Sequence, residues 1–108
     1  MSNTSLLQGT LDVLILKALA LEPMHGLAIS RRIEQVTRGT FQVKPGSLFP
    51  ALHRMEEAGW VRSEWIKKES GRRARIYELT VAGKKQLAQE ESRWQTVTSA
   101  VNRVLRTC

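Results

Sequence analysis

The stretch KPGSLFPALHRMEEAGW, residues 44–60, has the spacing of an amphipathic helix, yet it holds a proline near its start. Ser47 is predicted to cap this helix, which would place Pro50 in the first turn. The N–H groups of a first turn have no helical acceptor, so a proline is tolerated there and its restricted φ suits the helix. Gly59 is predicted to end the helix.

The predicted helix has two unlike faces. At 100° per residue, one side carries Leu48, Ala51, Leu52 and Met55, and the other carries Gly46, Pro50, His53, Arg54 and Glu57. The first turn therefore presents a compact, partly apolar edge, with the side chains of His53 and Arg54 one turn later. Taken alone, this pattern favours an ordinary surface helix with a solvated polar face.

A charged β-hairpin is predicted directly after this helix. The segment WVRSEWIKKESGRRARIYELT, residues 60–80, contains two short alternating stretches around a glycine. Residues 67–75 hold five basic side chains and one acidic side chain. A run of charges is usually a solvated face. This one is concentrated at a hairpin tip, beside a helix that presents a compact edge.

Further helices are predicted on both sides of this unit. The first, near residues 10–22, has Thr10 as its cap and is apolar nearly all round, so a second subunit is expected to cover part of it, including Leu14. A second helix spans residues 25–39, and a short extended segment follows at residues 40–44. The last helix begins after Thr80 and carries a heptad-like apolar seam, interrupted at Glu90. The seam could pack on its own domain or on another chain, and we expect the second arrangement.

Composition and charge limit the function. The chain has 108 residues, which suits one small domain, and its net charge of +7 favours a polyanionic partner, either nucleic acid or an anionic membrane surface. The single cysteine, Cys108, cannot form an internal disulfide, which suits a reducing cytoplasm. The apolar run near residues 11–21 is too short to span a bilayer and contains Asp12 and Lys17. We therefore expect a cytoplasmic protein without a membrane association.

The sequence offers no catalytic set. His25 and His53 are the two histidines, and neither lies in a cluster of cysteines or carboxylates that would bind a metal. There is also no nucleophile with a matching base, and no glycine-rich phosphate loop. We expect no enzyme activity, no metal and no cofactor.

The order of the predicted elements indicates a mainly α fold with a small β-hairpin, a winged helix-turn-helix. Residues 1–80 would form the DNA-binding domain and residues 81–108 a dimerisation helix. A helix presented by its amino-terminal end can enter the major groove, where Pro50 and Ala51 suit a thymine methyl group. The wing arginines can lie along phosphates or enter the adjacent minor groove.

Two motifs at this spacing resemble a known family. The stretch GSLFPALHRMEEAGW followed by GRRARIYELTVAGKKQL is similar to the PadR family of bacterial transcriptional regulators, over roughly residues 6–105. The stretch LLQGTLDVLILKALALEPMHG resembles a compact, acidobacterial-type subgroup. The resemblance implies a homodimer, formed by the C-terminal helix with help from the first helix, that binds a palindromic operator in double-stranded DNA. Most members are repressors, and some are relieved by phenolic or drug-like compounds.

The resemblance and the pattern together give two sets of candidate residues. The predicted DNA contacts are Lys44, Ser47, Phe49, Pro50, His53, Arg54, Arg72, Arg73 and Arg75. The predicted dimer interface consists of Leu14, Leu87, Trp94, Val97, Val101 and Val104. Relatives usually carry tyrosine at the position of Phe49, so this side chain could serve packing only. Some relatives that bind aromatic drugs carry a tryptophan near the position of Trp94, which makes Trp94 the candidate site for a small aromatic effector.

One alternative function is a winged-helix module that binds proteins and has no specific DNA binding. The wing argues against this alternative, because a protein-binding surface does not need so many arginines on a hairpin tip. The resemblance therefore favours a sequence-specific DNA-binding transcriptional regulator.

Overall fold

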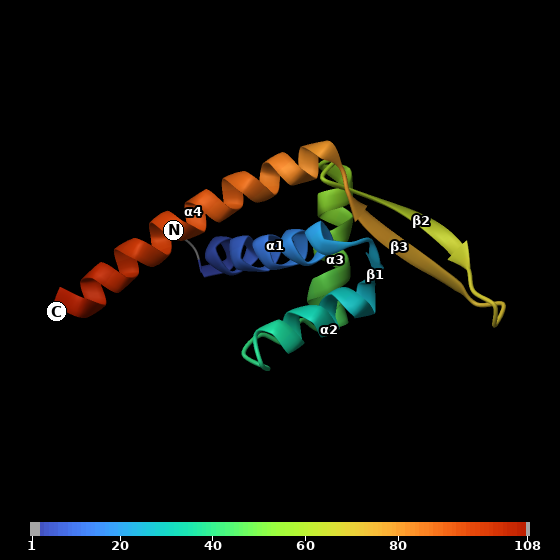
Figure 1. Ribbon diagram of the computed structural model, residues 1–108, viewed down its shortest axis with the longest axis horizontal. Coiled ribbons are helices and arrows are strands. Elements are labelled where there is room, and N and C mark those ends of the chain that lie inside the picture. The colour runs from blue at the N-terminus through green and yellow to red at the C-terminus, as the bar shows by residue number, and fades with distance from the viewer. Residues whose placement is uncertain (1–2, 108) are drawn as a thin grey trace.

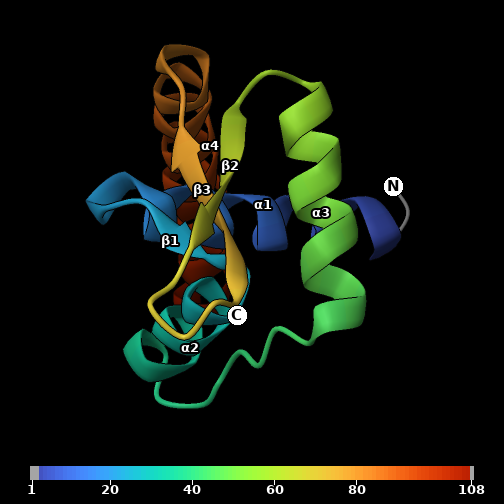
Figure 2. The same ribbon diagram turned by 90° about the vertical axis from the view of Figure 1, so that its right-hand side faces the viewer.

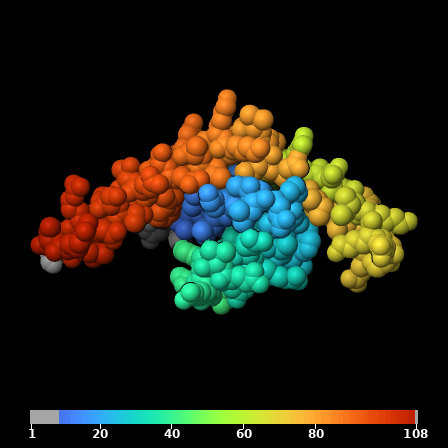
Figure 3. Space-filling model, viewed as in Figure 1, coloured from blue at the N-terminus to red at the C-terminus, as the bar shows by residue number. Residues whose placement is uncertain are grey.

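The computed structural model describes residues 3–107, with side chains from residue 9 onward, as helices around a small sheet (Figure 1). The elements in chain order are α1 (Asn3–Leu21), β1 (Met24–His25), α2 (Gly26–Val36), α3 (Pro45–Glu57), β2 (Val61–Lys67), β3 (Arg73–Leu79) and α4 (Val81–Thr107). Helices α1, α2 and α3 lie together as a body (Figure 1), and two arms extend from it, the β2–β3 hairpin and the far half of α4 (Figure 3). The molecule is accordingly elongated, with extents of 58 × 29 × 25 Å.

The sheet is antiparallel with the strand order β1-β3-β2. The predicted hairpin is confirmed, and its register runs from the pair Val61↔Leu79 to the pair Lys67↔Arg73. The third strand is β1, which pairs Met24 with Tyr77. The segment at residues 40–44, which was expected to be extended, is irregular and forms no strand. A strand of two residues is too short to show an alternating pattern, so β1 could not be predicted from periodicity.

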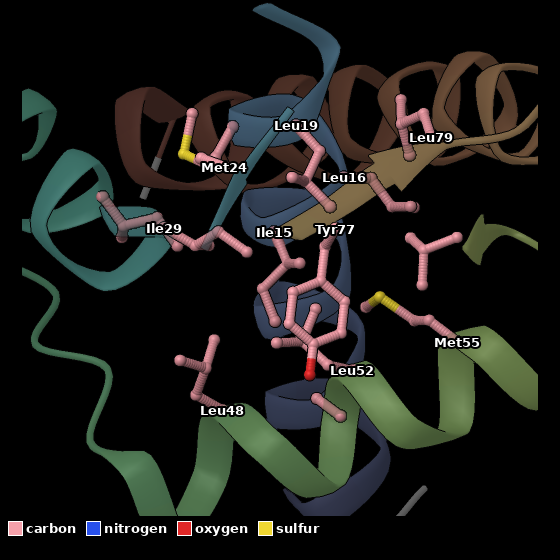
Figure 4. Close-up of a cluster of buried hydrophobic side chains, with 14 of the residues drawn as sticks. Ile15, Leu16, Leu19, Met24, Ile29, Leu48, Leu52, Met55, Tyr77 and Leu79 are labelled. Carbon is pink, nitrogen blue, oxygen red and sulfur yellow. The ribbon is translucent and has the colours of Figure 1, made fainter. Parts of the chain in front are cut away.

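The hydrophobic core lies where α1, α2, α3 and the base of the hairpin meet (Figure 4). The largest fully buried side chains are Ile15, Leu16, Ile29, Leu48, Leu52, Met55 and Val61. The apolar side predicted for residues 48–55 is therefore confirmed as the buried face of α3. Its burial directs the opposite face of α3 away from the body, because the two faces of an amphipathic helix point in opposite directions.

Helix α1 starts earlier than the sequence indicated. It begins at Asn3, so Thr10 lies within the helix and the predicted cap at Thr10 is wrong. The predicted end before Pro23 is confirmed, because α1 ends at Leu21. Although α1 is rich in apolar residues, no helix in the described part of the chain combines the length and apolar character needed to cross a membrane.

Helix α3 also starts earlier than predicted, and this changes the role of its prolines. Lys44 takes the N-cap position and Pro45 is the first helical residue, so the predicted cap at Ser47 is wrong. Pro45, rather than Pro50, occupies the position where a missing N–H has no consequence. Pro50 lies inside the helix and cannot donate to the carbonyl of Gly46, four residues earlier. Gly46 is exposed, so water can satisfy that carbonyl.

Helix α4 belongs partly to the body and partly to an arm. Thr80 caps it, as predicted, because its Oγ1 accepts a hydrogen bond from the N–H of Gly83 at 3.0 Å. Gly83, Leu87 and Glu90 are buried in the first half. A Cβ on Gly83 would lie only 2.0 Å from the carbonyl oxygen of Trp60, so α4 approaches the start of the hairpin closely. The second half of the helix projects from the body (Figures 1 and 3).

Candidate nucleic-acid interface

The outward edge of α3 carries most of the predicted contacts from this helix. Lys44, Ser47, Pro50 and His53 are all exposed. The side chain of His53 is 75% exposed, and its Nε2 lies 2.6 Å from Oε1 of Glu57. The small side chains come first and the longer imidazole follows one turn later, so the amino-terminal end of the helix can approach another surface closely.

The first turn of α3 has neither a side-chain cap nor an acidic residue in the described chain. Lys44 has an extended backbone, with φ −83° and ψ 155°, and its side chain makes no capping hydrogen bond within the described chain. The first turn also contains no acidic residue. Pro45 has no N–H, and the N–H groups of Ser47 and Leu48 donate to the carbonyl of Lys44 at 3.0 and 2.9 Å. The positive end of the helix dipole nevertheless favours an anion at this position, and a phosphate is a suitable one.

Phe49 points toward α2 rather than straight outward. A Cβ added to Gly26 would meet two atoms of the Phe49 ring at 2.7 and 2.9 Å, so the ring lies directly on this glycine. The side chain nevertheless remains 41% exposed. The structure thus brings Phe49 into a packing contact with α2 at the edge of the predicted interface.

The hairpin forms a basic wing with an ordered tip. The N–H of Lys68 donates to the carbonyl of Arg72 at 2.8 Å, and Gly71 has a φ of 87°, which closes the turn. Lys67, Lys68, Arg72 and Arg73 are all exposed. Arg72 and Arg73, two of the predicted contacts, therefore present their charges to solvent at the far end of the wing.

Arg75 is oriented by the protein itself. Its Nε donates to Oγ of Ser63 at 2.8 Å, and its Nη2 lies 3.2 and 3.4 Å from the two carboxylate oxygens of Glu56 on α3. Ser63 also donates to Glu56, at 2.7 Å. Beside this network, burial raises the pKa of Tyr77 above its usual value, while the charge of Arg75 opposes the shift. Arg75 therefore links the wing to α3, and its charge is already balanced by a carboxylate.

Arg54 is the predicted contact that needs a correction. Its guanidinium donates to both carboxylate oxygens of Asp12 on α1, at 2.7 and 3.0 Å. The hydrogen bonds to Asp12 raise the pKa of Arg54 above its usual value. Asp12 is only 8% exposed. Arg54 reaches Asp12 on α1 and holds α3 against that helix, so we assign it this bracing role and do not retain it as a DNA contact.

The amino-terminal end of α3 and the tip of the wing lie on the same side of the molecule (Figure 2). A groove of about 450 Å³ separates the wing from α2 and α3. Its lining includes the aromatic rings of Phe49, Trp65 and Tyr77 and the basic side chains of Arg31, Lys68 and Arg75. Trp65 was not among the predicted site residues. It alternates with Arg62 and Glu64 along β2, so its side chain lies on the other face of the strand from theirs. The resulting surface is basic and concave, and flanked by a helix end.

The predicted dimer residues divide into two groups. Leu87 is 6% exposed and packs in the core of its own chain, so its assignment to the dimer interface is corrected. Leu14 is partly buried against the same core. Trp94 is half-buried, whereas Val97, Val101 and Val104 are 39%, 50% and 58% exposed. The stripe formed by Trp94, Val97, Val101 and Val104 lies on the arm of α4, beyond the body.

The two histidines have roles that need no metal. His25 caps α2, because its Nδ1 accepts a hydrogen bond from the N–H of Ala28 at 3.3 Å. Within the described residues, no group of three or more histidine, cysteine, aspartate or glutamate side chains could hold a metal ion.

The fold and the basic concave surface define the class of a winged helix-turn-helix regulator. Residues 15–89 match the model of the "Transcriptional regulator PadR-like family". The chain belongs to this PadR-like family of transcriptional regulators. The members and structural neighbours are regulators rather than enzymes, and regulators of this family act by binding DNA.

Individual relatives agree with this assignment. The crystal structure of TA0346 from Thermoplasma acidophilum, described as a transcriptional regulator, is 33% identical, with a TM-score of 0.83, and the match covers 96% of this chain and 98% of that one. A PadR family transcription regulator from Clostridium difficile is 29% identical with a TM-score of 0.74, over 87% and 96% of the two chains. Transcriptional regulator Rv3488 from Mycobacterium tuberculosis is 34% identical over 67 residues, which are 62% of this chain and 59% of that protein.

Proposed function

We propose that this protein is a sequence-specific, homodimeric repressor that binds a palindromic operator through α3 and the wing. The observation that carries the proposal is that the open amino-terminal end of α3 and the basic wing tip lie on one side of the molecule (Figure 2). An isolated cationic patch would bind DNA without sequence preference, because phosphates are the same at every base pair. A helix end beside such a patch adds side chains that can reach base edges.

The proposed contacts separate into reading and positioning residues. Ser47, Pro50 and His53 would face base edges in the major groove, with small apolar contacts first and a hydrogen-bonding imidazole next. Lys44, Arg72 and Arg73 would bind phosphates. Phe49 remains at the edge of the interface as a packing residue.

Two further residues brace the recognition surface from either side. Arg54 ties α3 to α1 through Asp12, and Arg75 ties α3 to the wing through Glu56. Both arginines lie close to the proposed DNA, yet each already has a carboxylate partner. Their proposed role is to hold the angle between α3 and the wing.

We infer the dimer from the stripe on the arm of α4. Trp94, Val97, Val101 and Val104 leave a continuous apolar stripe beyond the body, and such a stripe on a helix usually packs against another helix. A two-fold axis across this stripe would bring the same patch of two chains together. The partly buried Leu14 on α1 would lie beside it. Two recognition helices related by this axis would match two half-sites.

A small aromatic effector would act at Trp94. Near a two-fold axis, the indole rings of two chains either close on each other or leave a flat apolar slot between them. A planar aromatic compound in that slot would change the angle between the subunits and hence the spacing of the recognition helices. Only the open arrangement would let planar aromatic compounds quench the fluorescence of Trp94.

Selection from random double-stranded DNA tests the proposed function. We expect an enriched inverted repeat whose half-sites lie about one helical turn apart. An enriched motif without two-fold symmetry would contradict the homodimer and leave DNA recognition standing. Recovery of no motif, with the protein folded, would favour the protein-interaction alternative.

A further inference from the structure

Trp65 is a large aromatic residue that lies outside the hydrophobic core. It lies on β2, opposite Arg75 in the hairpin register, and its side chain is 55% exposed. The guanidinium carbon of Arg73 lies 4.8 Å from the centroid of the Trp65 ring, and that of Arg75 lies 5.6 Å away. Trp65 thus contacts two wing arginines on one face of the hairpin, next to the groove that faces α2 and α3.

The two arginines have different surroundings. Arg75 donates to Ser63 and pairs with Glu56, so its charge and its hydrogen-bonding edge are largely used within the protein. For Arg73, no carboxylate lies within ion-pair distance in the described part of the chain, and the side chain is exposed. The contact with the indole ring is the interaction that orients the Arg73 guanidinium.

Stacking on a ring can orient a guanidinium for phosphate binding because the guanidinium is planar. A guanidinium that lies on an indole face is held by cation–π attraction, while its N–H groups around the edge remain free. These edge groups form paired, charge-assisted hydrogen bonds to phosphate oxygens. A long side chain that is already oriented loses less conformational entropy when it binds. The stack therefore prepares Arg73 for a phosphate without consuming its donors.

We propose that Trp65 is a positioning residue that holds Arg73 in the orientation in which it binds a DNA phosphate. This inference rests on the proposed function, because it assumes that the wing lies against DNA. It adds a role for a residue that makes no proposed contact with DNA of its own. It also separates the two arginines, since Arg75 anchors the indole and the wing while Arg73 contacts the phosphate.

A double-mutant cycle on the selected operator tests the proposal. The variants are Trp65→Ala, Arg73→Ala and the double substitution, with Trp65→Phe to restore an aromatic face. Ile66→Ala is the matched control, because Ile66 is a neighbouring residue on β2, is 41% exposed and alternates to the other side of the strand. Operator affinity is measured at several salt concentrations, and thermal unfolding shows that each variant is folded.

We expect Trp65→Ala to weaken binding by roughly threefold to tenfold, the scale of a cation–π contact. Its salt dependence should stay unchanged, because Arg73 still reaches the phosphate. Arg73→Ala should lower the slope of log affinity against log salt by about 0.9, the value for one phosphate contact. The double variant should bind like Arg73→Ala alone, Trp65→Phe should recover part of the loss, and Ile66→Ala should bind like the parent.

Two outcomes would overturn the proposal. If the losses from Trp65→Ala and Arg73→Ala were additive, Trp65 would act independently of Arg73. If Arg73→Ala left the salt slope unchanged, Arg73 would not bind a phosphate. Failure of the parent protein to bind any DNA would instead contradict the proposed function, so the two failures are distinguishable.

Discussion

Arg54 on α3 donates two hydrogen bonds to the buried carboxylate of Asp12 on α1, at 2.7 and 3.0 Å. This pair joins the recognition helix to the helix beneath it. Arg54→Ala would leave the Asp12 carboxylate buried without its partner, so we expect a loss of stability. The Arg54 side chain is 38% exposed, and solvent screening reduces the effect to about 1–3 kcal/mol in the free energy of unfolding. Chemical denaturation measures this loss.

His53 is the matched control for this prediction, because it is the adjacent residue and points outward. His53→Ala should change the free energy of unfolding by less than about 0.5 kcal/mol, as is usual for exposed positions. It should alter the base preference in a selection experiment, whereas Arg54→Ala should keep the preference of the parent. A change in preference from Arg54→Ala with unchanged stability would show that Arg54 reads DNA.

The wing should contribute affinity without selectivity. We expect Arg72→Ala combined with Arg73→Ala to weaken binding to all sequences by similar factors, since phosphate contacts position the protein and base contacts specify the site. The slope of log affinity against log salt should fall by about 2 for the two lost contacts. Titrations of the operator and of a shuffled duplex measure both quantities. A change in sequence preference with unchanged general affinity would mean that the wing reads bases.

Periodicity in the sequence predicted the elements of the fold and the buried face of α3. Leu48, Leu52 and Met55 recur at helical spacing, and the alternation around Trp65 predicted the hairpin. The helix starts were missed for a local reason. Ser47 is a good capping residue, but Pro45 has the restricted φ of a first helical residue, and α3 starts three positions earlier than a cap at Ser47 would place it.

Direction and pairing of side chains were harder to predict. Arg54 shares a helix face with His53 in projection, yet its long side chain reaches Asp12, 42 positions earlier in the chain. Such a partner depends on the packing of α1 against α3, which no local pattern contains. The same holds for Leu87, whose heptad spacing is compatible with either a dimer seam or the core of its own chain.

Leu87 and Val101 should therefore respond differently to substitution. Leu87→Ala removes a core side chain and should destabilise the protomer by about 2–5 kcal/mol. Val101→Asp places a charge on the exposed stripe and should shift sedimentation toward the monomer while the helical circular dichroism persists. Ser99→Asp, which adds the same charge on the other side of α4, is the control and should leave the dimer intact. A Val101→Asp protein as dimeric as the parent would contradict the proposed interface.

Substitution of Trp94 tests the two arrangements proposed at the two-fold axis, in which the indole rings either close on each other or leave a slot. Trp94→Ala should weaken the dimer in both, by roughly 3–5 kcal/mol if the indole is fully packed between the chains. Only an open slot predicts that planar aromatic compounds quench fluorescence and that the quenching disappears in Trp94→Ala. Trp60 and Trp65 remain as internal controls in that variant. Sedimentation that showed an equally tight dimer after Trp94→Ala would contradict both models.

The close approach at Gly83 gives a prediction about stability alone. A methyl group there would lie 2.0 Å from the backbone oxygen of Trp60, so Gly83→Ala must displace α4 or the start of the hairpin. We expect a loss of about 1–3 kcal/mol, typical of overpacking. Gly46→Ala meets no atom within 4 Å and should be neutral or stabilising by up to about 1 kcal/mol. Thermal unfolding of the two variants, compared with the parent, measures the difference.

The salt dependence of binding to the selected operator and to a shuffled duplex tests sequence-specific DNA recognition most directly. With a net charge of +7 and a basic wing, log affinity should fall steeply with log salt for both duplexes, by about 0.9 per phosphate contact. The operator should keep a clear advantage over the shuffled duplex at every salt concentration, because base contacts do not depend on released counterions. Equal affinities for the two duplexes, or affinities that do not change with salt, would contradict the account.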